Sequence, residues 1–386
     1  MAEISDALGT TSNKSALGWS GISYKLLKWT FACRPDHLLE IYEAALTLGH
    51  HPWHEAKVVI LPKPQQPDYS LPKAYRPISL LKCCGKLLEK LIAKHIASDV
   101  NLFSLLPPNQ FRSRDYHSTV DAAMCLVHQA EGALSAGRCA ATVLFDIQGF
   151  FDNLNVKQLV HIFHSLGFPP SYGEWLLSFL TNCTVRLTFN SFVSDPINLS
   201  HGTPQGSPLS PILSAIYMSP LLKTTHANWS LKGLNTYVDD GAITATSATH
   251  HGAARQAASG FAEVTSWLHR NSLAIDPDKT KFISFFKQKA LVTHSSLPNS
   301  LSLEDPVHGL HVVLQSSVVC YLGIFIKHNL TWDHHMTIMA NYARSTVRAI
   351  SILGNLVRGI HAAHWRTIFH ALILPVLTYS FPLYAL

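Results

Sequence analysis

The chain has 386 residues, of which 47% are hydrophobic and 14% charged, and its 30 Lys and Arg against 24 Asp and Glu give a formal net charge of +6. This composition excludes a mainly disordered protein, and the length predicts two or three packed subdomains. The seven cysteines show no C-x-x-C spacing, so we expect reduced thiols and no zinc site. The N-terminus lacks the apolar stretch of a secretory signal, and Pro375 and Pro382 interrupt the apolar C-terminal segment. We therefore expect an intracellular protein without a signal peptide or a transmembrane segment.

The pattern of apolar and turn-forming residues predicts a loose polar tail over residues 1–15, followed by alternating helices and strands. The expected helices cover 24–48 (split near Arg34-Pro35), 79–96 (amphipathic, with its lysines outside), 155–166, 171–182, 209–223 and 252–270, and Arg-bearing helices end the chain. The expected strands cover 56–64, 141–147, 184–190, 193–199 and 281–286, with hairpins at 235–246 and around 318–326 and a proline-rich loop after the first strand. Strands interleaved with helices in irregular order indicate an α+β fold.

Basic residues are concentrated in two stretches. Between Lys57 and Lys94, eight Lys and Arg stand against two acidic residues, and the last 46 residues hold four Arg and no acid. Two basic surfaces beside an acidic centre suit a ligand with a phosphate backbone. Ordinary solvated lysines on helix faces explain the first stretch equally well.

Three aspartates follow apolar β-rich runs. Asp146 lies near the end of ATVLFDI, directly after Phe145, and Asp239 and Asp240 lie at the turn of the hairpin NTYVDDGAITAT. Carboxylates gathered at the rim of a sheet would repel one another and raise one another's pKa unless a cation neutralised them. Such oxygen ligands select Mg²⁺, and two ions would activate a 3′-hydroxyl and stabilise a leaving pyrophosphate. Taken alone, paired Asp in a hairpin is a weak signal, because Asp is common at turns.

The motifs around these aspartates resemble those of the reverse transcriptase family in kind and order. FDIQGFFDNL and YVDDG resemble its two catalytic motifs, HGTPQGSPLSPIL its nucleotide-handling loop, LAIDPDKTKFISF its lysine motif and YLGIFI its primer-grip hairpin. Upstream, LPKPQQPDYSLPKAYRPISLLKCCGKLLEK resembles the fingers motif and NQFRSRDYHSTVDA the block after it. The resemblance covers roughly residues 15–386. Within the family, SALGWSGISYKLLKW and PISLLKCCGKLLEK are most similar to the non-LTR (LINE-type) retrotransposon enzymes, and we favour fungal members.

The resemblance implies a right-hand polymerase in which an antiparallel palm sheet is backed by helices. The implied parts are a flexible tail (1–15), an N-terminal extension with fingers (16–139), a catalytic palm (140–290) and a primer-grip hairpin with thumb (291–386), with the reverse transcriptase domain at about 56–327. The implied activity is RNA-directed DNA synthesis from a primer 3′-hydroxyl with two Mg²⁺ ions, or Mn²⁺ in their place. The implied partners are an RNA template, a DNA primer and dNTPs, with no membrane and no zinc, and insertion would take place in the nucleus. An inactive remnant that only binds RNA is the alternative.

The resemblance also implies roles for individual residues. The catalytic group comprises Asp146, Asp239 and Asp240 as metal ligands, and Lys279 as general acid for pyrophosphate. The substrate-binding group comprises Lys63 and Arg76 for the triphosphate, Phe151 beneath the sugar, and Gly202, Pro204, Gln205, Gly206 and Tyr237. The nucleic-acid-binding group comprises Gln110, Tyr321, Leu322, Gly323, Arg344 and Arg348. The glycines and prolines of the loop support this independently, because they let the backbone approach a nucleotide closely. Solvated basic side chains and, for Phe151, a core aromatic remain the alternatives.

Overall fold

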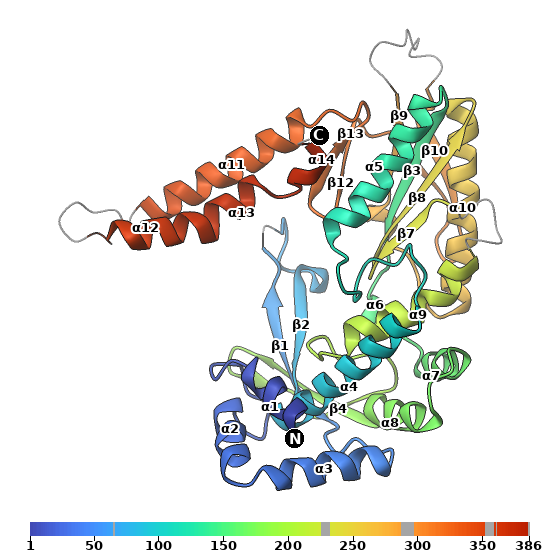
Figure 1. Cartoon of the computed structure of the whole chain (residues 1–386). Coiled ribbons are helices and arrows are strands. Elements are labelled where there is room, and N and C mark those ends of the chain that lie inside the picture. The colour runs from blue at the N-terminus through green and yellow to red at the C-terminus, as the bar shows by residue number, and fades with distance from the viewer. Residues whose placement is uncertain (65, 225–231, 287–296, 352–358, 360, 385–386) are drawn as a thin grey trace. The chain divides into compact units, whose positions relative to one another are not determined.

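The computed structural model describes residues 1–64, 66–224, 232–286, 297–351, 359 and 361–384. The chain forms two compact units, each assembled from separate stretches of sequence (Figure 1). Unit 1 contains residues 1–116, 147–224 and 267–275, and unit 2 contains residues 117–146, 225–266 and 276–386. The sequence predicts subdomain boundaries at 139/140 and 290/291. In the structure, the chain passes from one unit to the other directly after Asp146, and again on either side of residues 267–275.

Unit 1 combines helices with one mixed sheet. Its helices are α1 (Ala2–Gly9), α2 (Tyr24–Cys33), α3 (Pro35–Thr47), η1 (Pro72–Ala74), α4 (Cys83–Leu102), α6 (Phe150–Asn153), α7 (Val156–Ser165), α8 (Pro170–Leu180) and α9 (Ser210–Thr224). Its strands are β1 (Glu55–Pro62), β2 (Tyr75–Leu80), β4 (Cys183–Phe189), β5 (Phe192–Val193) and β6 (Ile197–Leu199). The sheet order is β2-β1-β4-β5, with β6 also on β4; β1 is antiparallel to β2 and parallel to β4.

The N-terminal residues are not the loose tail that their polar composition predicts. Residues Ala2–Gly9 form α1, which packs against α4 and buries Ile4 and Leu8. These two side chains are four residues apart and therefore share one helix face. Lys90 of α4 also donates a 3.3 Å hydrogen bond to the carbonyl of Ala7. A short helix thus replaces the expected tail because it covers apolar surface on α4.

Part of the expected proline-rich loop is also regular structure. Residues Tyr75–Leu80 form β2, and Pro77 lies opposite Ile60 of β1. A proline is tolerated here because β2 is an edge strand, which pairs only with β1. The missing N–H of Pro77 therefore removes no hydrogen bond to a second neighbouring strand. The helix expected from residue 79 accordingly begins only at Cys83.

Unit 2 is built around an antiparallel sheet in the order β7-β8-β3-β9. Its strands are β3 (Cys139–Asp146), β7 (Leu234–Tyr237), β8 (Asp240–Ser247), β9 (Lys281–Phe285), β10 (Ser300–Asp305), β11 (Gly309–Leu314), β12 (Val318–Tyr321) and β13 (Ile324–Lys327). Its helices are α5 (Thr119–Ser135), α10 (His250–Arg270, of which the last turn belongs to unit 1), η3 (Pro277–Lys279), α11 (Asp333–Ile350), α12 (Ala362–Ile368), η6 (Phe369–Ile373), α13 (Leu374–Leu377) and α14 (Phe381–Tyr384). The mixture of helices and sheets in both units confirms the α+β class.

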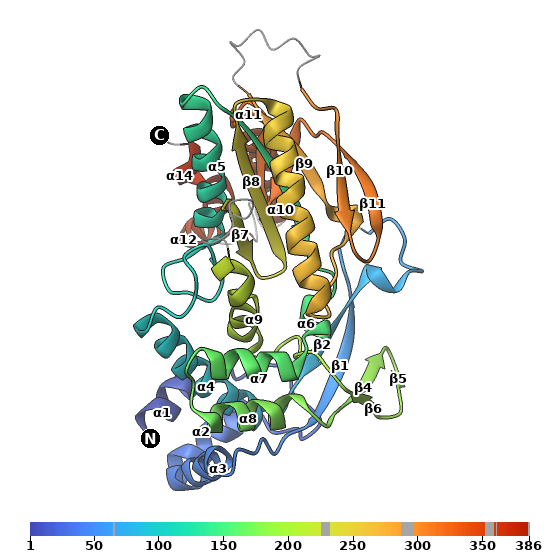
Figure 2. The same ribbon diagram turned by 90° about the vertical axis from the view of Figure 1, so that its right-hand side faces the viewer.

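Helices α5 and α10 lie on opposite faces of this sheet (Figure 2). Phe261 of α10 meets Phe145 of β3, with ring centroids 6.0 Å apart. Cys125 of α5 instead reaches Asn235 of β7, with Sγ 3.5 Å from Oδ1. Because side chains alternate between faces along a strand, this register directs Asp146 to the α5 face. Ser118 and Asp121 cap the N-terminus of α5 reciprocally, as a capping box.

The hairpin β10–β11 was not expected from the sequence. Every second residue of β10 is buried, namely Leu301, Leu303 and Asp305. In its partner β11, however, the apolar residues Leu310 and Val312 are exposed. Apolar residues on the outer face obscure the alternation that identifies a half-buried strand.

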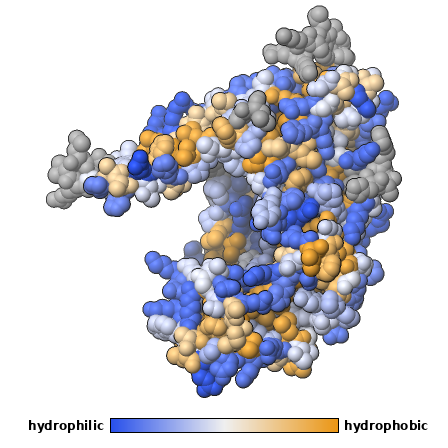
Figure 3. All heavy atoms as spheres, in the orientation of Figure 1, coloured by the Kyte–Doolittle hydropathy of each residue, from blue (hydrophilic) through white to orange (hydrophobic). Residues whose placement is uncertain are grey.

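The surface mixes hydrophilic and hydrophobic residues, and apolar side chains lie between polar ones along the terminal helices (Figure 3). Met336, Val347 and Phe369 are among the exposed ones. Within the described ranges, no helix combines the length and hydropathy that a bilayer span requires.

Candidate active site

The first group of predicted catalytic residues meets where strands of the unit 2 sheet begin or end, which we call the edge of this sheet. Asp146, the last residue of β3, lies directly opposite Asp240, the first residue of β8. Tyr237 of β7 lies opposite Asp240 on its other side. Directly opposite residues on adjacent strands project to the same face, so Asp146, Asp240 and Tyr237 share the face that α5 covers further along. Asp239 lies one residue before Asp240, in the turn between β7 and β8.

The β7–β8 turn has a strained backbone at Val238. Its φ is +61°, in the left-handed region that β-branched residues rarely adopt. A tight hairpin turn demands such an angle to bring Tyr237 and Asp240 into register. Strain of this kind persists only where the surrounding structure enforces it, and it is concentrated at functional sites.

The carboxylates interact electrostatically with one another and with one lysine. Burial, followed by the negative charges of Asp239 and Asp146, raises the pKa of Asp240 to about 7, and the positive charge of Lys279 opposes this shift. Lys279 Nζ lies 2.7 Å from Asp146 Oδ2 and 3.7 Å from Asp276 Oδ2. Burial by itself would lower the pKa of Lys279, but its hydrogen bond to Asp146 and the neighbouring carboxylates hold that pKa above its usual range.

The donor set at this edge suits a hard divalent cation. Carboxylate oxygens are the ligands that Mg²⁺ prefers, and the negative charges of Asp239 and Asp146, which contribute to the raised pKa of Asp240 after burial, are ones that a cation would neutralise. In the part of the chain that the structure describes, no three His, Cys, Asp or Glu side chains are arranged as a metal site. This is also true of Asp146, Asp239 and Asp240.

A cavity of about 410 Å³ opens beside the paired aspartates. Its lining includes Asp146, Asp240, Lys279, Cys320 and Tyr321. Tyr321 is only 3% exposed, and its buried hydroxyl has no hydrogen-bond partner among the described residues. The predicted contact between Tyr321 and nucleic acid is therefore not available in this conformation. Cys320 also lines the cavity, although no motif or spacing in the sequence singles it out.

The turn after Tyr321 is more accessible. Leu322 is half-buried with a φ of +52°, and Gly323 is exposed. The hydroxyl of Tyr379 donates a 2.6 Å hydrogen bond to the carbonyl of Leu322. This contact links the β12–β13 turn to the C-terminal segment. Leu322 and Gly323 thus remain candidates for contact with a nucleic acid.

The second group of predicted residues forms a loop in unit 1, residues 202–208, which we call the nucleotide loop. The amides of Gly202 and Thr203 donate to the carbonyls of Leu154 and Phe151, at 2.9 and 2.6 Å. The carbonyl of Gln205 accepts a 2.8 Å hydrogen bond from the amide of Ser79 in β2. The loop is therefore held between the α6 segment and β2.

Two positions in the nucleotide loop require glycine. Gly202 has a φ of +88°, and a Cβ there would lie 2.6 Å from the carbonyl oxygen of Asp152. Gly206 has a φ of +124°, and its Cβ would lie 2.7 Å from the carbonyl oxygen of Ser79. Both the backbone angle and the lack of space exclude a side chain. The two glycines therefore let the loop pack closely against protein backbone, and the predicted approach of this backbone to a nucleotide stays a prediction.

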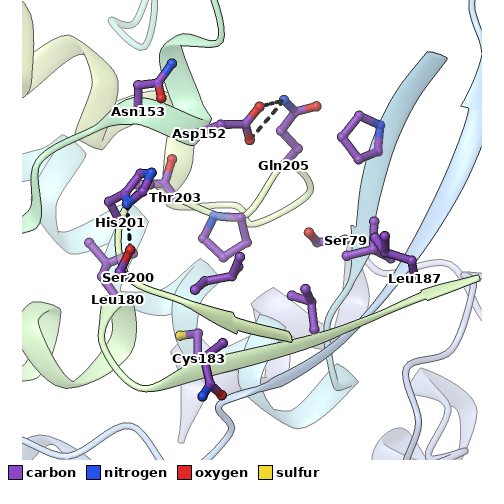
Figure 4. A pocket seen from close by; sticks show the side chains of 17 residues that line it. Ser79, Asp152, Asn153, Leu180, Cys183, Leu187, Ser200, His201, Thr203 and Gln205 are labelled. Atoms are coloured by element: carbon purple, nitrogen blue, oxygen red, sulfur yellow. Dashed lines mark hydrogen bonds between the residues drawn. The ribbon is translucent and has the colours of Figure 1, made fainter. Parts of the chain in front are cut away.

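The nucleotide loop borders a cavity of about 340 Å³, shown in Figure 4. Leu180, Val185 and Leu187 contribute apolar surface to it. Gln205 projects at the rim, and its Nε2 donates to the two carboxylate oxygens of Asp152 at 3.3 and 3.5 Å (Figure 4). Burial raises the pKa of Asp152, while the Gln205 hydrogen bond acts against that shift. Sequence reasoning missed Asp152, although it directly follows the singled-out Phe151.

The two neighbouring phenylalanines have different environments. Phe150 is 3% exposed and belongs to the core of unit 1, whereas Phe151 is only partly buried. Phe151 therefore has a surface that a ligand can reach, as its predicted role requires. The position of Phe151 beneath a sugar stays a prediction.

The predicted basic contacts are accessible to different degrees. Arg76 is exposed on β2, whereas Lys63 donates a 2.8 Å hydrogen bond to the carbonyl of Lys73. Arg344 and Arg348 are exposed on one face of α11, and Arg344 donates to Asn341. Gln110, by contrast, is completely buried in unit 1. A buried side chain does not reach a duplex, so the predicted contact of Gln110 with a nucleic acid stays a prediction that would require this segment to move.

Residues 61–326 match the family described as "Reverse transcriptase (RNA-dependent DNA polymerase)". The chain is 30% identical over 340 residues to a "Probable RNA-directed DNA polymerase from transposon BS" of Drosophila melanogaster, an alignment that covers 86% of this chain and 36% of the relative. It is 26% identical over 354 residues to the corresponding protein from transposon X-element of the same species, covering 89% and 37%. It is 24% identical over 366 residues to the "RNA-directed DNA polymerase from mobile element jockey", also from that species, covering 92% and 38%.

The chain spans little more than a third of the length of these relatives. Their insect source gives no support to the expected fungal origin. The family match itself covers most of the chain and includes the segments that carry Asp146, the nucleotide loop, Asp240 and Lys279. The chain therefore belongs to the reverse transcriptase (RNA-dependent DNA polymerase) family.

Proposed function

We propose that this chain is the RNA-directed DNA polymerase core of a non-LTR retrotransposon, which adds dNTPs to a primer 3′-hydroxyl on an RNA template. The observation that carries the proposal is the direct pairing of Asp146 with Asp240 at the edge of an antiparallel sheet, with Lys279 in contact. The membership of the family and the transposon origin of the relatives support it.

In this proposal, Asp146, Asp239 and Asp240 bind two Mg²⁺ ions, for which Mn²⁺ can substitute. Bound there, the ions supply the positive charge that activates the primer 3′-hydroxyl and stabilises the leaving pyrophosphate. The three carboxylates fix where that charge lies. Lys279 is close enough to Asp146 to act at the same place, and its Nζ donates a proton to the leaving pyrophosphate.

The nucleotide loop and its neighbours receive the dNTP in this proposal. Gly202, Pro204 and Gly206 keep the backbone compact, so that Gln205 contacts the nucleotide and Phe151 packs beneath its sugar. Tyr237 of unit 2 is also assigned a contact with the nucleotide. Lys63 and Arg76 bind the triphosphate, for which the planar fork of Arg is well suited. Leu322, Gly323, Arg344 and Arg348 follow the DNA primer and RNA template.

Fingers, palm and thumb are the functional parts that we assign to residues 16–139, 140–290 and 291–386. Synthesis from a chromosomal primer would take place in the nucleus. The rival function is an inactive remnant that binds RNA through the basic surfaces alone.

Primer extension tests the proposal directly. The wild type, given an RNA template, a DNA primer, dNTPs and Mg²⁺, should extend the primer, and the chelator EDTA should stop the reaction. Asp146→Asn should abolish extension, because the loss of a metal ligand costs many orders of magnitude in rate. Asp195→Asn, which changes an exposed aspartate elsewhere, is the matched control and should extend normally. RNA binding without extension by the wild type would favour the remnant instead.

A further inference from the structure

Glu89 is a carboxyl group in an apolar environment. It lies in the middle of α4, where Leu88 and Ile92 are also buried, and only 1% of its surface is exposed. Helix α4 packs against α9 in unit 1. A charged group is seldom buried unless a partner stabilises it, because burial removes its hydration. The position of Glu89 therefore calls for an explanation other than packing.

The partner of Glu89 belongs to the nucleotide loop. The hydroxyl of Ser207 donates a 2.5 Å hydrogen bond to Glu89 Oε2, across 118 residues of sequence. Ser207 is itself buried, and its oxygen accepts a 3.1 Å hydrogen bond from the amide of Leu209, just before α9 begins. One hydroxyl thus joins α4, the nucleotide loop and the beginning of α9.

The nucleotide loop is fixed on both sides of Gly206. On one side, the amide of Ser79 holds the carbonyl of Gln205. On the other side, Glu89 holds the side chain of Ser207. Gly206 lies between these two attachments with its φ of +124°. Between them, the attachments limit the positions that the Gln205 side chain can take at the rim of the cavity.

We propose that Glu89 is a positioning residue for nucleotide binding: through Ser207 it sets the backbone of Gln205 and Gly206 in the conformation that receives the incoming dNTP. This inference rests on the proposed function, since it takes the nucleotide loop as the dNTP-binding element. Burial raises the pKa of Glu89 to about 7, while the Ser207 hydrogen bond and the charge of Lys86 oppose that shift. The carboxyl group is therefore kept at a cost in stability, as expected for a residue retained for function.

Four variants separate positioning from packing. Glu89→Leu removes the hydrogen-bond acceptor but fills the apolar site, and Ser207→Ala removes the donor. Glu89→Gln keeps an acceptor oxygen in the same place and is the conservative variant. Ser214→Ala is the matched control, because the Ser214 hydroxyl is also buried in unit 1 but only bonds the carbonyl of Pro211 within α9, at 2.6 Å.

The first measurement is the KM for dNTP and the kcat of primer extension. We expect Glu89→Leu and Ser207→Ala each to raise KM about tenfold, the scale of one hydrogen bond to a charged group, with a smaller change in kcat. The double variant should be no worse than either single one, since both remove the same contact. Glu89→Gln and Ser214→Ala should keep the wild-type KM. A purely structural role would lower the fraction of active protein and leave KM unchanged.

The second measurement is amide hydrogen exchange of residues 203–209, which needs no catalysis. Faster exchange confined to this loop in Glu89→Leu and Ser207→Ala supports the proposal. Wild-type KM and wild-type exchange in both variants overturn it, and so does an equal effect of Ser214→Ala. If the wild type extends no primer, the proposed function fails, and the exchange measurement alone then decides whether Glu89 orders the loop. If Glu89→Leu does not fold, Ser207→Ala carries both measurements.

Discussion

Lys279 Nζ lies 2.7 Å from Asp146 Oδ2, so that a side chain of η3 touches the carboxylate at the end of β3. The two residues are 133 positions apart in the sequence. The same carboxylate lies opposite Asp240 in the sheet. The lysine therefore balances part of the negative charge at this edge and is within reach of the atoms on which the proposed chemistry takes place.

Lys279 should act as a proton donor and not only as a positive charge. Lys279→Gln should lower kcat by about 10²–10⁴-fold, the usual contribution of general acid catalysis, with a smaller effect on the KM for dNTP. Lys279→Arg keeps the charge, but a guanidinium holds its proton more tightly than an ammonium group does, so its kcat should also be low. Single-turnover primer extension measures both rates. Full activity of Lys279→Arg would show that the charge alone is needed.

Asp240→Asn should stabilise the protein while it abolishes synthesis. The substitution removes a half-buried charge that Asp239 and Asp146 repel, and we expect a gain of about 1–3 kcal/mol in the free energy of unfolding at pH 8. Urea unfolding in metal-free buffer measures the stability, and primer extension measures the activity. A variant that is less stable and still active would remove Asp240 from the proposed cation site.

Arg76→Ala should raise the KM for dNTP much more than it weakens template binding. A charge-assisted contact with phosphate is worth about 1.5–3 kcal/mol. Lys63→Ala should have a milder effect, since Lys63 already bonds the carbonyl of Lys73. Lys94→Ala, on the exposed side of α4, is the control for a general loss of basic charge. Lower RNA affinity with an unchanged dNTP dependence would instead assign Arg76 to the template path.

Phe151→Val should increase the use of ribonucleotides. If the ring packs beneath the sugar, its removal opens space for a 2′-hydroxyl, and the ratio of dNTP to rNTP incorporation efficiency should fall. Phe150→Val is the matched control, because Phe150 is buried in the core. Truncation of a buried Phe costs up to about 3–5 kcal/mol, so thermal unfolding of both variants must be measured as well. An unchanged ratio in Phe151→Val would show that Phe151 only packs against the protein and takes no part in sugar selection.

Glu89 should make stability depend on pH. Its pKa in the folded protein is raised to about 7, so the carboxyl group of Glu89 binds a proton more tightly in the folded state than in the unfolded state. Stability should therefore fall as the pH rises from the ordinary carboxyl pKa to about 7 and stay low above it. Glu89→Gln should remove this dependence and gain at most about 3 kcal/mol at pH 8, with little change at pH 4 to 5.

Urea unfolding from pH 4 to 8, followed by tryptophan fluorescence, measures this effect. Glu131→Gln, at an exposed position of α5, is the control and should leave the pH profile unchanged. A Glu89→Gln profile parallel to that of the wild type would mean that the pKa of Glu89 is the same in the folded and the unfolded protein.

Much of the chemistry could be predicted from the sequence, because it depends on short motifs. The aspartates at the ends of apolar runs, the glycine- and proline-rich loop and the positions of most helices and strands follow from residues that are neighbours in the chain. Local propensity and the alternation of apolar residues determine such elements directly. The motif order was also enough to predict the family.

Only the tertiary structure decided which distant residues meet. The register that pairs Asp146 with Asp240, the contact of Gln205 with Asp152 and the hydrogen bond from Ser207 to Glu89 join segments that no local pattern relates. Packing also decided that Gln110 and Tyr321 are buried, that residues 2–9 form a helix on α4 and that β10 and β11 form a hairpin. The physical reason is that burial depends on the surface that another segment offers, and the sequence of one segment does not contain that surface.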